Sequence, residues 1–470
     1  MSVAVSTVHG ETLEVSAESL EVLTSSVRGS VVTPGSPGYD EARTIWNGMI
    51  DRRPGLVVRC AGQADVVRAV RFATERELLI AVRGAGHNIA GKGVADGSLL
   101  IDLSGLRSVR VDPKAKRVFV EPGATLRDLD DETQVFGLAT PTGINSTTGI
   151  AGLTLGGGFG WLSKKYGLTV DSLRSAQVVL ADGRVVTASA HEHPDLFWGL
   201  RGGGGNFGIV TSFEFELYEV GPTVLSGLIV HPAAAAPEVM RYFAKFNADS
   251  SDDVNVWAVL RKAPPLPFLP AEVHGTDILI LAAFCTGDMA TGEKALQPLR
   301  DFGDPIADVI GPHPFAGWQQ AFDPLLTPGA RNYWKSHNFA SMPEGLIDTA
   351  IEFAGRLPSG QTEIFFGGLG GQVNRAPIDS TAYPHRDAEY VMNVHARWED
   401  PADDEKCIAW ARAYYEATEP YATGGVYVNF VPEGDAAIAQ AYGPNYERLV
   451  GLKRKYDPRN LFRVNQNIAP

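Results

Sequence analysis

The residues whose types and spacing most clearly suit ligand binding form a short loop, Arg-Gly-Ala-Gly-His, at residues 83–87. Gly84 and Gly86 allow consecutive backbone N–H groups to converge on an anion without interference from side chains, a nest suited to a pyrophosphate. Arg83 adds positive charge, and a histidine directly after such a nest can reach the group to which the pyrophosphate is attached. The residues by themselves fit an ordinary tight turn with a surface histidine equally well.

The elements before this loop predict where it lies. Residues 56–60 have the pattern of a strand, residues 65–77 that of a helix, and residues 79–83 that of a second strand. In such strand–helix–strand units, ligands gather at the carboxyl ends of the strands. The loop therefore stands where a ligand is expected, before residues 99–103 resume a strand pattern.

Two further glycine clusters lie in the first half of the chain, at residues 143–160 and 202–208. Gly203, Gly205 and Gly208 match the spacing of a dinucleotide-binding fingerprint. That fingerprint requires a strand before it and a helix after it, whereas the alternating strand pattern of residues 210–217 follows here. A Rossmann fold is therefore disfavoured.

The second half of the chain has a different texture. From about residue 221, proline-rich turns separate strand patterns at residues 278–284 and 363–366, and an amphipathic stretch covers residues 405–416. This pattern indicates a second domain of sheet and helices. The last segment, residues 427–470, is rich in aromatic and amide side chains and is predicted to return to the first domain.

Composition excludes several classes of partner. The 470 residues contain 41 Lys and Arg against 55 Asp and Glu, a net charge of −14, so nucleic acid and anionic membranes are not expected partners. The apolar stretch at residues 278–285 is far shorter than the ~20 residues of a membrane helix. The N-terminus lacks the pattern of a secretory signal, and the three cysteines lack disulfide or zinc spacing. We therefore expect a cytoplasmic protein without a metal site.

Four linked motifs carry a resemblance to a known family. They are Arg-Gly-Ala-Gly-His at 83–87, Gly-Gly-Gly-Phe-Gly-Trp-Leu-Ser-Lys-Lys-Tyr-Gly-Leu at 156–168, Asp-Leu-Phe-Trp-Gly-Leu-Arg-Gly-Gly-Gly-Gly-Asn-Phe-Gly-Ile-Val at 195–210, and an ending with Tyr-Val-Asn-Phe at 427–430, Tyr-Asp-Pro-Arg-Asn-Leu-Phe at 456–462 and Asn-Gln-Asn-Ile at 465–468. Together they resemble the berberine bridge enzyme-like FAD-linked oxidases of the vanillyl-alcohol oxidase and p-cresol methylhydroxylase superfamily. Within the family, the chain is most similar to bacterial members, including polyketide-modifying and 6-hydroxy-D-nicotine oxidase-like ones.

The resemblance implies an α+β fold of two domains. Residues 1–217 together with 425–470 are expected to bind FAD. Residues 218–424 are expected to form an antiparallel-sheet substrate domain that is covered by helices.

The resemblance also implies how the flavin is attached. In this family the loop histidine, here His87, bonds covalently to the 8α carbon of FAD. Many members add a cysteinyl bond from a position that is Asn145 here, and no cysteine lies near it. We therefore expect a flavin that is tethered once, through His87.

Three residues carry the implied chemistry, and each has a plainer alternative. Thr148 occupies the position of the family's oxygen gatekeeper, which favours reoxidation by O2 to H2O2; it is otherwise a loop threonine. Tyr427 is the expected base for a substrate hydroxyl, although a phenol titrates at about 10 and its pKa must be lowered by a neighbouring cation or by the flavin environment; it is otherwise a packing residue. Glu363 is expected to be an acid or base on the substrate side or, alternatively, an exposed carboxylate at a strand end.

The remaining expectations concern contacts with the cofactor. The residues expected to hold FAD are Arg83, Gly84, Ala85, Gly86, His87 and Asn88, then Gly149, Gly152, Gly157, Gly158 and Gly160, then Ile209 and Val210 near the adenine, and Asn465 and Asn467 from the ending. Leu153 departs from several plant members, which place a histidine there. Stabilisation of the reduced flavin must then come from another group.

The expected reaction is two-electron oxidation of an alcohol C–H on a polyketide-like, aromatic or sugar-like small molecule, with O2 as the acceptor. Oxidation of an amine C–N bond is the alternative, and it does not need Tyr427 as a base. A flavin-binding protein without catalysis is a third possibility.

Overall fold

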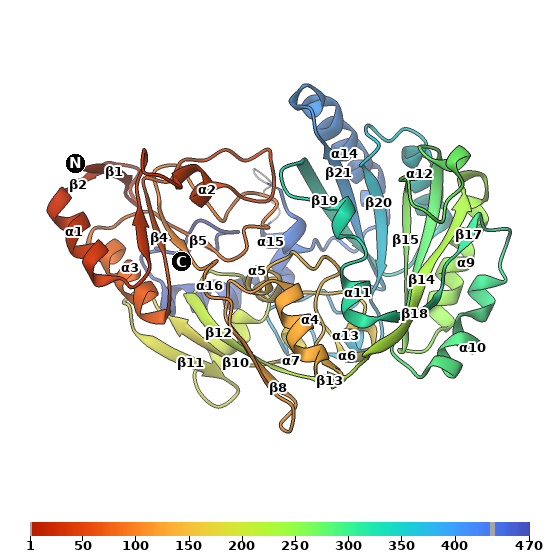
Figure 1. Cartoon of the computed structure of the whole chain (residues 1–470), viewed down its shortest axis with the longest axis horizontal. Coiled ribbons are helices and arrows are strands. Elements are labelled where there is room, and N and C mark those ends of the chain that lie inside the picture. The colour runs from red at the N-terminus through yellow and green to blue at the C-terminus, as the bar shows by residue number, and fades with distance from the viewer. Residues whose placement is uncertain (1, 433–437) are drawn as a thin grey trace.

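The computed structural model describes residues 2–432 and 438–470 and has two lobes (Figure 1). One lobe holds the N-terminal half of the chain and the last helices, and the other holds the middle of the chain. The described residues form an α+β structure, with three larger sheets and two small two-stranded ones. The predicted fold class is confirmed.

The predicted strand–helix–strand unit is present in a four-stranded sheet. In spatial order its strands are β3 (Ser30–Val32), β4 (Leu56–Arg59), β6 (Leu99–Asp102) and β5 (Ile80–Arg83). Strands β4 and β5 each pair with β6 in parallel, and α3 (Gln63–Glu75) packs Val66, Val70 and Ala73 into the core. The loop at residues 83–87 therefore begins at the carboxyl end of a parallel strand, as predicted.

The first 55 residues are more structured than their weak pattern indicates. They form β1 (Val3–Ser6), β2 (Thr12–Val15), α1 (Ala17–Ser26), β3 and α2 (Tyr39–Arg43). The buried carboxylate of Asp65 accepts hydrogen bonds from the backbone N–H groups of Arg28, Gly29 and Ala61. This tertiary contact, rather than periodicity, holds the start of the chain against α3.

A five-stranded antiparallel sheet follows. Its order is β11 (Val185–Ser189), β10 (Leu173–Val179), β12 (Ile209–Glu216), β8 (Arg117–Val120) and β7 (Val109–Asp112). The helix α8 (Pro194–Leu200) precedes the glycine cluster at 202–208 and β12 follows it, so the Rossmann arrangement is absent there. Strand β13 (Tyr218–Glu219) follows β12 in the sequence and pairs antiparallel with β9 (Leu138–Ala139).

The middle of the chain forms an eight-stranded antiparallel sheet. Its strands are β17 (Ala307–Asp308), β14 (Thr223–Pro232), β16 (Asp277–Cys285), β15 (Val254–Lys262), β20 (Glu363–Gly368), β21 (Tyr390–Trp398) and β19 (Arg331–Phe339), and β18 (Gly311–Pro314) also pairs with β14. One face packs against α9 (Ala236–Asp249), α10 (Met289–Arg300), α12 (Glu344–Ala354) and α14 (Asp404–Thr418) in a large apolar core. The opposite face is turned toward the glycine-rich loops, so side chains alternate between core and site.

Short helices complete the structure. They are α4 (Leu126–Gln134), α5 (Ile150–Leu155), α6 (Ser163–Tyr166), α7 (Thr169–Ser172), α11 (Phe315–Gln319), α13 (Gln372–Arg375), α15 (Ile438–Tyr442) and α16 (Tyr446–Tyr456), with 3₁₀ turns at Ala233–Ala235, Ala271–Val273, Asp323–Leu325, Pro401–Asp403, Glu419–Tyr421, Val428–Phe430 and Gly443–Asn445. Within the described residues, none of the helices combines the length and the apolar character that crossing a bilayer requires.

The last segment returns to the first lobe, as Figure 1 shows for α15 and α16. Val426, Tyr442 and Leu449 share a buried core with β8, β10 and β12. The domain boundaries at residues 217 and 425 stay a prediction.

One buried ion pair anchors this return. Lys453 Nζ lies 2.8 Å from Asp457 Oδ2, both side chains are fully buried, and Lys453 also donates to the backbone oxygens of Asn206 and Phe462. Removing one partner from a buried pair leaves an uncompensated charge.

We therefore predict that Lys453→Met lowers the free energy of unfolding by about 3–5 kcal/mol, measured by urea denaturation. Lys455→Met is the matched control, because Lys455 pairs with Asp195 at the surface; it should change the free energy by less than about 1 kcal/mol. Equal effects of the two substitutions would contradict this role for Lys453.

Candidate active site

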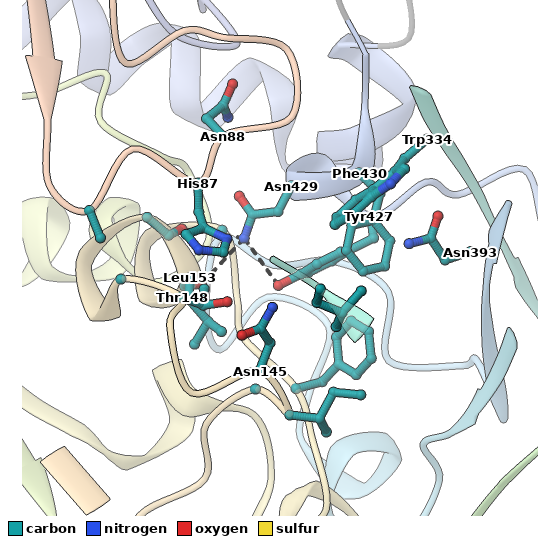
Figure 2. A pocket seen from close by; sticks show the side chains of 18 of the residues that line it. His87, Asn88, Asn145, Thr148, Leu153, Trp334, Asn393, Tyr427, Asn429 and Phe430 are labelled. Carbon is teal, nitrogen blue, oxygen red and sulfur yellow. Dashed lines mark hydrogen bonds between the residues drawn. The ribbon is translucent and has the colours of Figure 1, made fainter. Parts of the chain in front are cut away.

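A single continuous cavity of about 820 Å³ lies between the glycine-rich loops and the open face of the eight-stranded sheet. Its walls come from the loop after β5, the 143–156 segment, residues 204–210, the open sheet face and the C-terminal segment. Figure 2 shows the part of the cavity where His87 and Tyr427 face the same space. Segments far apart in the sequence therefore meet at one site.

The first two glycine-rich loops touch one another at the cavity wall. A Cβ added to Gly149 would lie 2.7 Å from the Cβ of Ala85, so this close approach requires glycine. At Gly152 and Gly205 an added Cβ would instead meet no atom within 4 Å, because both positions face open cavity. The backbone of the cavity wall is thus exposed to a bound molecule, as a dinucleotide site requires.

Arg83 has a different environment from the one its position suggests. Its Nη2 lies 2.7 Å from Asp102 Oδ2, its Nε lies 3.2 Å from Asp102 Oδ1, and its Nη1 donates to the backbone oxygen of Thr44. The guanidinium is buried and its charge is balanced by Asp102. Arg83 therefore joins β5 to β6 through its ion pair with Asp102, and it also lines the cavity. Because Asp102 balances its charge, Arg83 does not offer an uncompensated charge to an anion.

His87 is held as a neutral imidazole. Its ring stacks on Trp46 at 4.9 Å between centroids, and its Nε2 lies 3.1 Å from Thr147 Oγ1. Burial lowers the pKa of His87 to about 4, so the ring carries no charge at neutral pH. Sequence reasoning missed Trp46, which lies in the weakly patterned first 55 residues and has no motif around it.

The loop from Asn145 to Thr148 orders this histidine. Asn145 Oδ1 accepts hydrogen bonds from the backbone N–H of Thr147 at 3.1 Å and from its hydroxyl at 2.8 Å. Since the Thr147 hydroxyl gives its proton to Asn145, its oxygen is left to accept from His87 Nε2. Thr148 and Leu153 also line the cavity, on the same side of Tyr427 as His87 (Figure 2).

Tyr427 is pinned at the opposite wall. Its hydroxyl oxygen accepts hydrogen bonds from Gly158 N–H and from Asn429 Nδ2, both at 3.1 Å. Gly158 has φ of +73°, a backbone conformation that favours glycine. The backbone N–H of Tyr427 donates to Ser336 Oγ at 3.0 Å, which fixes the residue to strand β19. Because both acceptor positions are used, the phenol proton is left to point toward a ligand.

Burial raises the pKa of Tyr427 to about 12, and the two donors from Asn429 and Gly158 oppose that rise. These contacts therefore do not lower the pKa below its ordinary value. Within the described residues no cation is among them, and the hydroxyl accepts from an amide and a backbone N–H. Asn429 had no role in the sequence analysis, although it belongs to the quoted Tyr-Val-Asn-Phe motif. Its Nδ2 also lies 3.3 Å from the oxygen of Gly152, so it connects Tyr427 to the glycine-rich wall.

Glu363 begins β20 and its side chain is only 12% exposed, so its interpretation as an exposed strand-end carboxylate is wrong. Its Oε2 lies 2.5 Å from Arg261 Nη1 and its Oε1 lies 3.1 Å from His395 Nδ1. Burial acts to raise the pKa of Glu363, but Arg261 and His395 outweigh it and hold the pKa at about 2. Glu363 is therefore an ionised acceptor. Arg261 and His395 were missed, because only the strand register brings them to Glu363.

Most of the expected site residues reach the cavity. Those that line it are Arg83, Gly84, Ala85, Gly86, His87, Asn88, Thr148, Gly149, Gly152, Ile209, Val210, Glu363, Tyr427 and Asn465. The lining does not include Gly157, Gly158, Gly160 or Asn467. Gly158 contributes indirectly, through its hydrogen bond to the Tyr427 hydroxyl. The buried Oδ1 of Asn465 has no partner in the structure and is available to a ligand. Within the described ranges, no cluster of His, Cys, Asp or Glu could hold a metal ion.

Comparison with known proteins agrees with this geometry. Sequence models of two families match the chain: the FAD binding domain at residues 54–189 and "Berberine and berberine like" at residues 426–469. (R)-6-hydroxynicotine oxidase of Paenarthrobacter nicotinovorans is 32% identical over 464 residues, covering 95% of this chain and 97% of that protein. An uncharacterised FAD-linked oxidoreductase of Bacillus subtilis is 31% identical over 467 residues, covering 95% of this chain and 98% of its own.

The fold has solved relatives as well. The crystal structure of 6-hydroxy-D-nicotine oxidase from Arthrobacter nicotinovorans superposes with a TM-score of 0.85 at 29% identity, covering 95% of this chain and 98% of that one. Together with the cavity and its glycine-rich walls, these matches show that the chain belongs to the berberine bridge enzyme-like family of FAD-linked oxidoreductases, in the vanillyl-alcohol oxidase and p-cresol methylhydroxylase superfamily.

Proposed function

We propose that the protein is an oxidase whose FAD is bound covalently once, through His87, and which oxidises an alcohol C–H of a small molecule with O2 as the acceptor. The observation that carries this proposal is the Tyr427 hydroxyl, held by Gly158 and Asn429 at the wall of the cavity that His87 also lines. When bound, FAD supplies the two-electron acceptor. The protein positions the substrate and takes the hydroxyl proton.

The hydrogen bonds around His87 support the single tether. Asn145 Oδ1 orients the Thr147 hydroxyl, and Thr147 Oγ1 accepts from the Nε2–H of His87. The neutral ring then carries its lone pair on Nδ1, which is the nucleophilic nitrogen. Asn145 itself cannot form the second covalent bond that a cysteine would form.

We therefore predict that Thr147→Val lowers the fraction of covalently bound flavin, because the tautomer of His87 is no longer selected. Thr147→Ser, which keeps the hydroxyl, is the control and should leave that fraction unchanged. The measurement is flavin fluorescence of the denatured polypeptide on a gel, with free flavin counted in the supernatant. Complete release of flavin from the wild-type protein would refute the tether itself.

Tyr427, in its phenolate form, is proposed as the base that receives the substrate hydroxyl proton. Its two hydrogen-bond donors stabilise the phenolate, while burial destabilises it. With a pKa near 12, the phenolate is a minor form at neutral pH, and its fraction rises about tenfold per pH unit. Asn429 is a positioning residue that acts through the Tyr427 oxygen.

Tyr427→Phe is predicted to lower the rate of anaerobic flavin reduction by an alcohol about 10²-fold or more. The wild-type rate should rise from pH 7 to pH 10, since the pKa lies above this range, and the variant should lose this rise. Stopped-flow absorbance of the flavin measures both. A rate that Tyr427→Phe leaves unchanged would remove Tyr427 from the mechanism.

Thr148 is proposed as the residue that admits O2, because it is small and lines the cavity close to Asn145. We predict that Thr148→Leu slows reoxidation of the reduced flavin by O2 and leaves anaerobic reduction within about twofold. Peroxide assays on the wild type give the second readout. Turnover with artificial acceptors but without H2O2 would show a dehydrogenase instead.

Oxidation of an amine C–N bond is the second candidate. The raised pKa of Tyr427 favours amine oxidation, because a neutral amine can be oxidised without a phenolate that removes a proton from it. The similarity to (R)-6-hydroxynicotine oxidase points the same way. If the Tyr427→Phe variant still oxidises amines, and alcohols do not reduce the flavin of the wild type, the protein is an amine oxidase.

A further inference from the structure

The open face of the eight-stranded sheet carries one polar row. The strand register places Trp334 opposite His395, His395 opposite Glu363, and Glu363 opposite Arg261, so the four residues cross β19, β21, β20 and β15 in a line. All four line the cavity. The neighbouring row on the same face is mostly apolar and includes Phe365, Val259 and Ile280.

From this row, and resting on the alcohol oxidation proposed above, we propose that the substrate is an aromatic alcohol of more than one ring, and that Arg261 binds an acceptor oxygen, phenolic or carbonyl, at the end of the substrate far from Tyr427.

The donors of Arg261 are only partly used. A guanidinium has five N–H groups. One at Nε donates to the backbone oxygen of Lys262 and one at Nη1 donates to Glu363. Among the described residues the remaining three N–H groups have no hydrogen-bond partner, and Arg261 lines the cavity. Glu363, shared with His395, keeps the guanidinium oriented and its charge balanced, so a neutral acceptor oxygen suffices as the ligand.

The walls between Tyr427 and Arg261 fit flat apolar rings. Phe430 stands edge-on to Tyr427, to Phe365 and to Trp334, with centroids between 4.8 and 6.1 Å apart. Trp257 stacks on Phe365 at 5.5 Å, next along the sheet. Such ring faces gain energy from contact with aromatic ligands.

The strand order sets the reach of the ligand. The backbone N–H of Tyr427 is bonded to Ser336 on β19, and the backbone of Arg261 lies on β15, three strand spacings from β19. Three spacings span about 14 Å. Both side chains line the cavity between these strands, and two or three fused rings fill more of that space than a single ring does.

The test uses the FAD-loaded enzyme and three probes: 6-(hydroxymethyl)-2-naphthol, 2-naphthalenemethanol as the matched control without the distal oxygen, and xylobiose. Binding is followed anaerobically by the perturbation of flavin absorbance, and reduction by its bleaching. We expect the naphthol to bind about tenfold or more tightly than its control, as a hydrogen bond to a charged group implies, and xylobiose not to bind.

Two variants test whether Arg261 and Glu363 cause the preference for the naphthol over its control. Arg261→Gln combined with Glu363→Gln removes both charges together and is expected to bring the tenfold preference close to one, while the affinity for the control probe stays within about twofold. Arg261→Lys keeps the positive charge beside Glu363 but loses the planar guanidinium with its several N–H donors. It should therefore reduce the preference for the naphthol only partly. Thermal melting of both proteins verifies that they are folded.

The outcomes separate this inference from the proposed function. Tight binding of the naphthol without bleaching supports a ligand of more than one ring that is bound by Arg261, and contradicts alcohol oxidation. Bleaching by xylobiose, with weak naphthol binding, supports alcohol oxidation and overturns the inference. A preference that persists in the double variant, or no binding of either naphthyl probe, also overturns it.

Discussion

The site depends on the desolvated hydroxyl of Tyr427, which joins three parts of the chain. Its oxygen accepts from a glycine-rich turn and from Asn429 in the C-terminal segment, and its backbone is bonded to strand β19 of the large sheet. Any relative movement of the two lobes would break one of these bonds inside a low-dielectric cavity, where an unpaired polar group is costly. The same bonds therefore orient the phenol and hold the cavity walls together.

Burial also decides the charges around the cavity. His87 is neutral because desolvation disfavours its charged form, whereas Glu363 stays ionised because Arg261 and His395 compensate it. Of these groups, the ionised Glu363 thus lies on the large sheet, and the neutral His87 lies where the flavin is proposed to be attached. This division keeps a nucleophilic imidazole and a protonated phenol in one cavity at neutral pH.

The two faces of the large sheet serve different purposes. One packs four helices into an apolar core, and the other presents aromatic and polar side chains to the cavity. Successive side chains of a strand point to opposite faces of the sheet, so each strand contributes to both the core and the cavity. Predicting the strand at residues 363–366 was therefore easier than predicting which partners Glu363 meets, since these lie on β15 and β21.

The sequence by itself determined the strand–helix–strand unit, the strand nature of residues 210–217, 278–284 and 363–366, the loop that carries His87 and the Tyr-Val-Asn-Phe segment, because these depend on local periodicity, glycine and short motifs. Only the tertiary structure decided the partners: Asp102 for Arg83, Trp46 for His87, and Arg261 and His395 for Glu363. Ionisation and orientation follow from burial and from contacts between distant strands. Neither the ionisation nor the orientation of these side chains can be predicted from the residues next to them in the sequence.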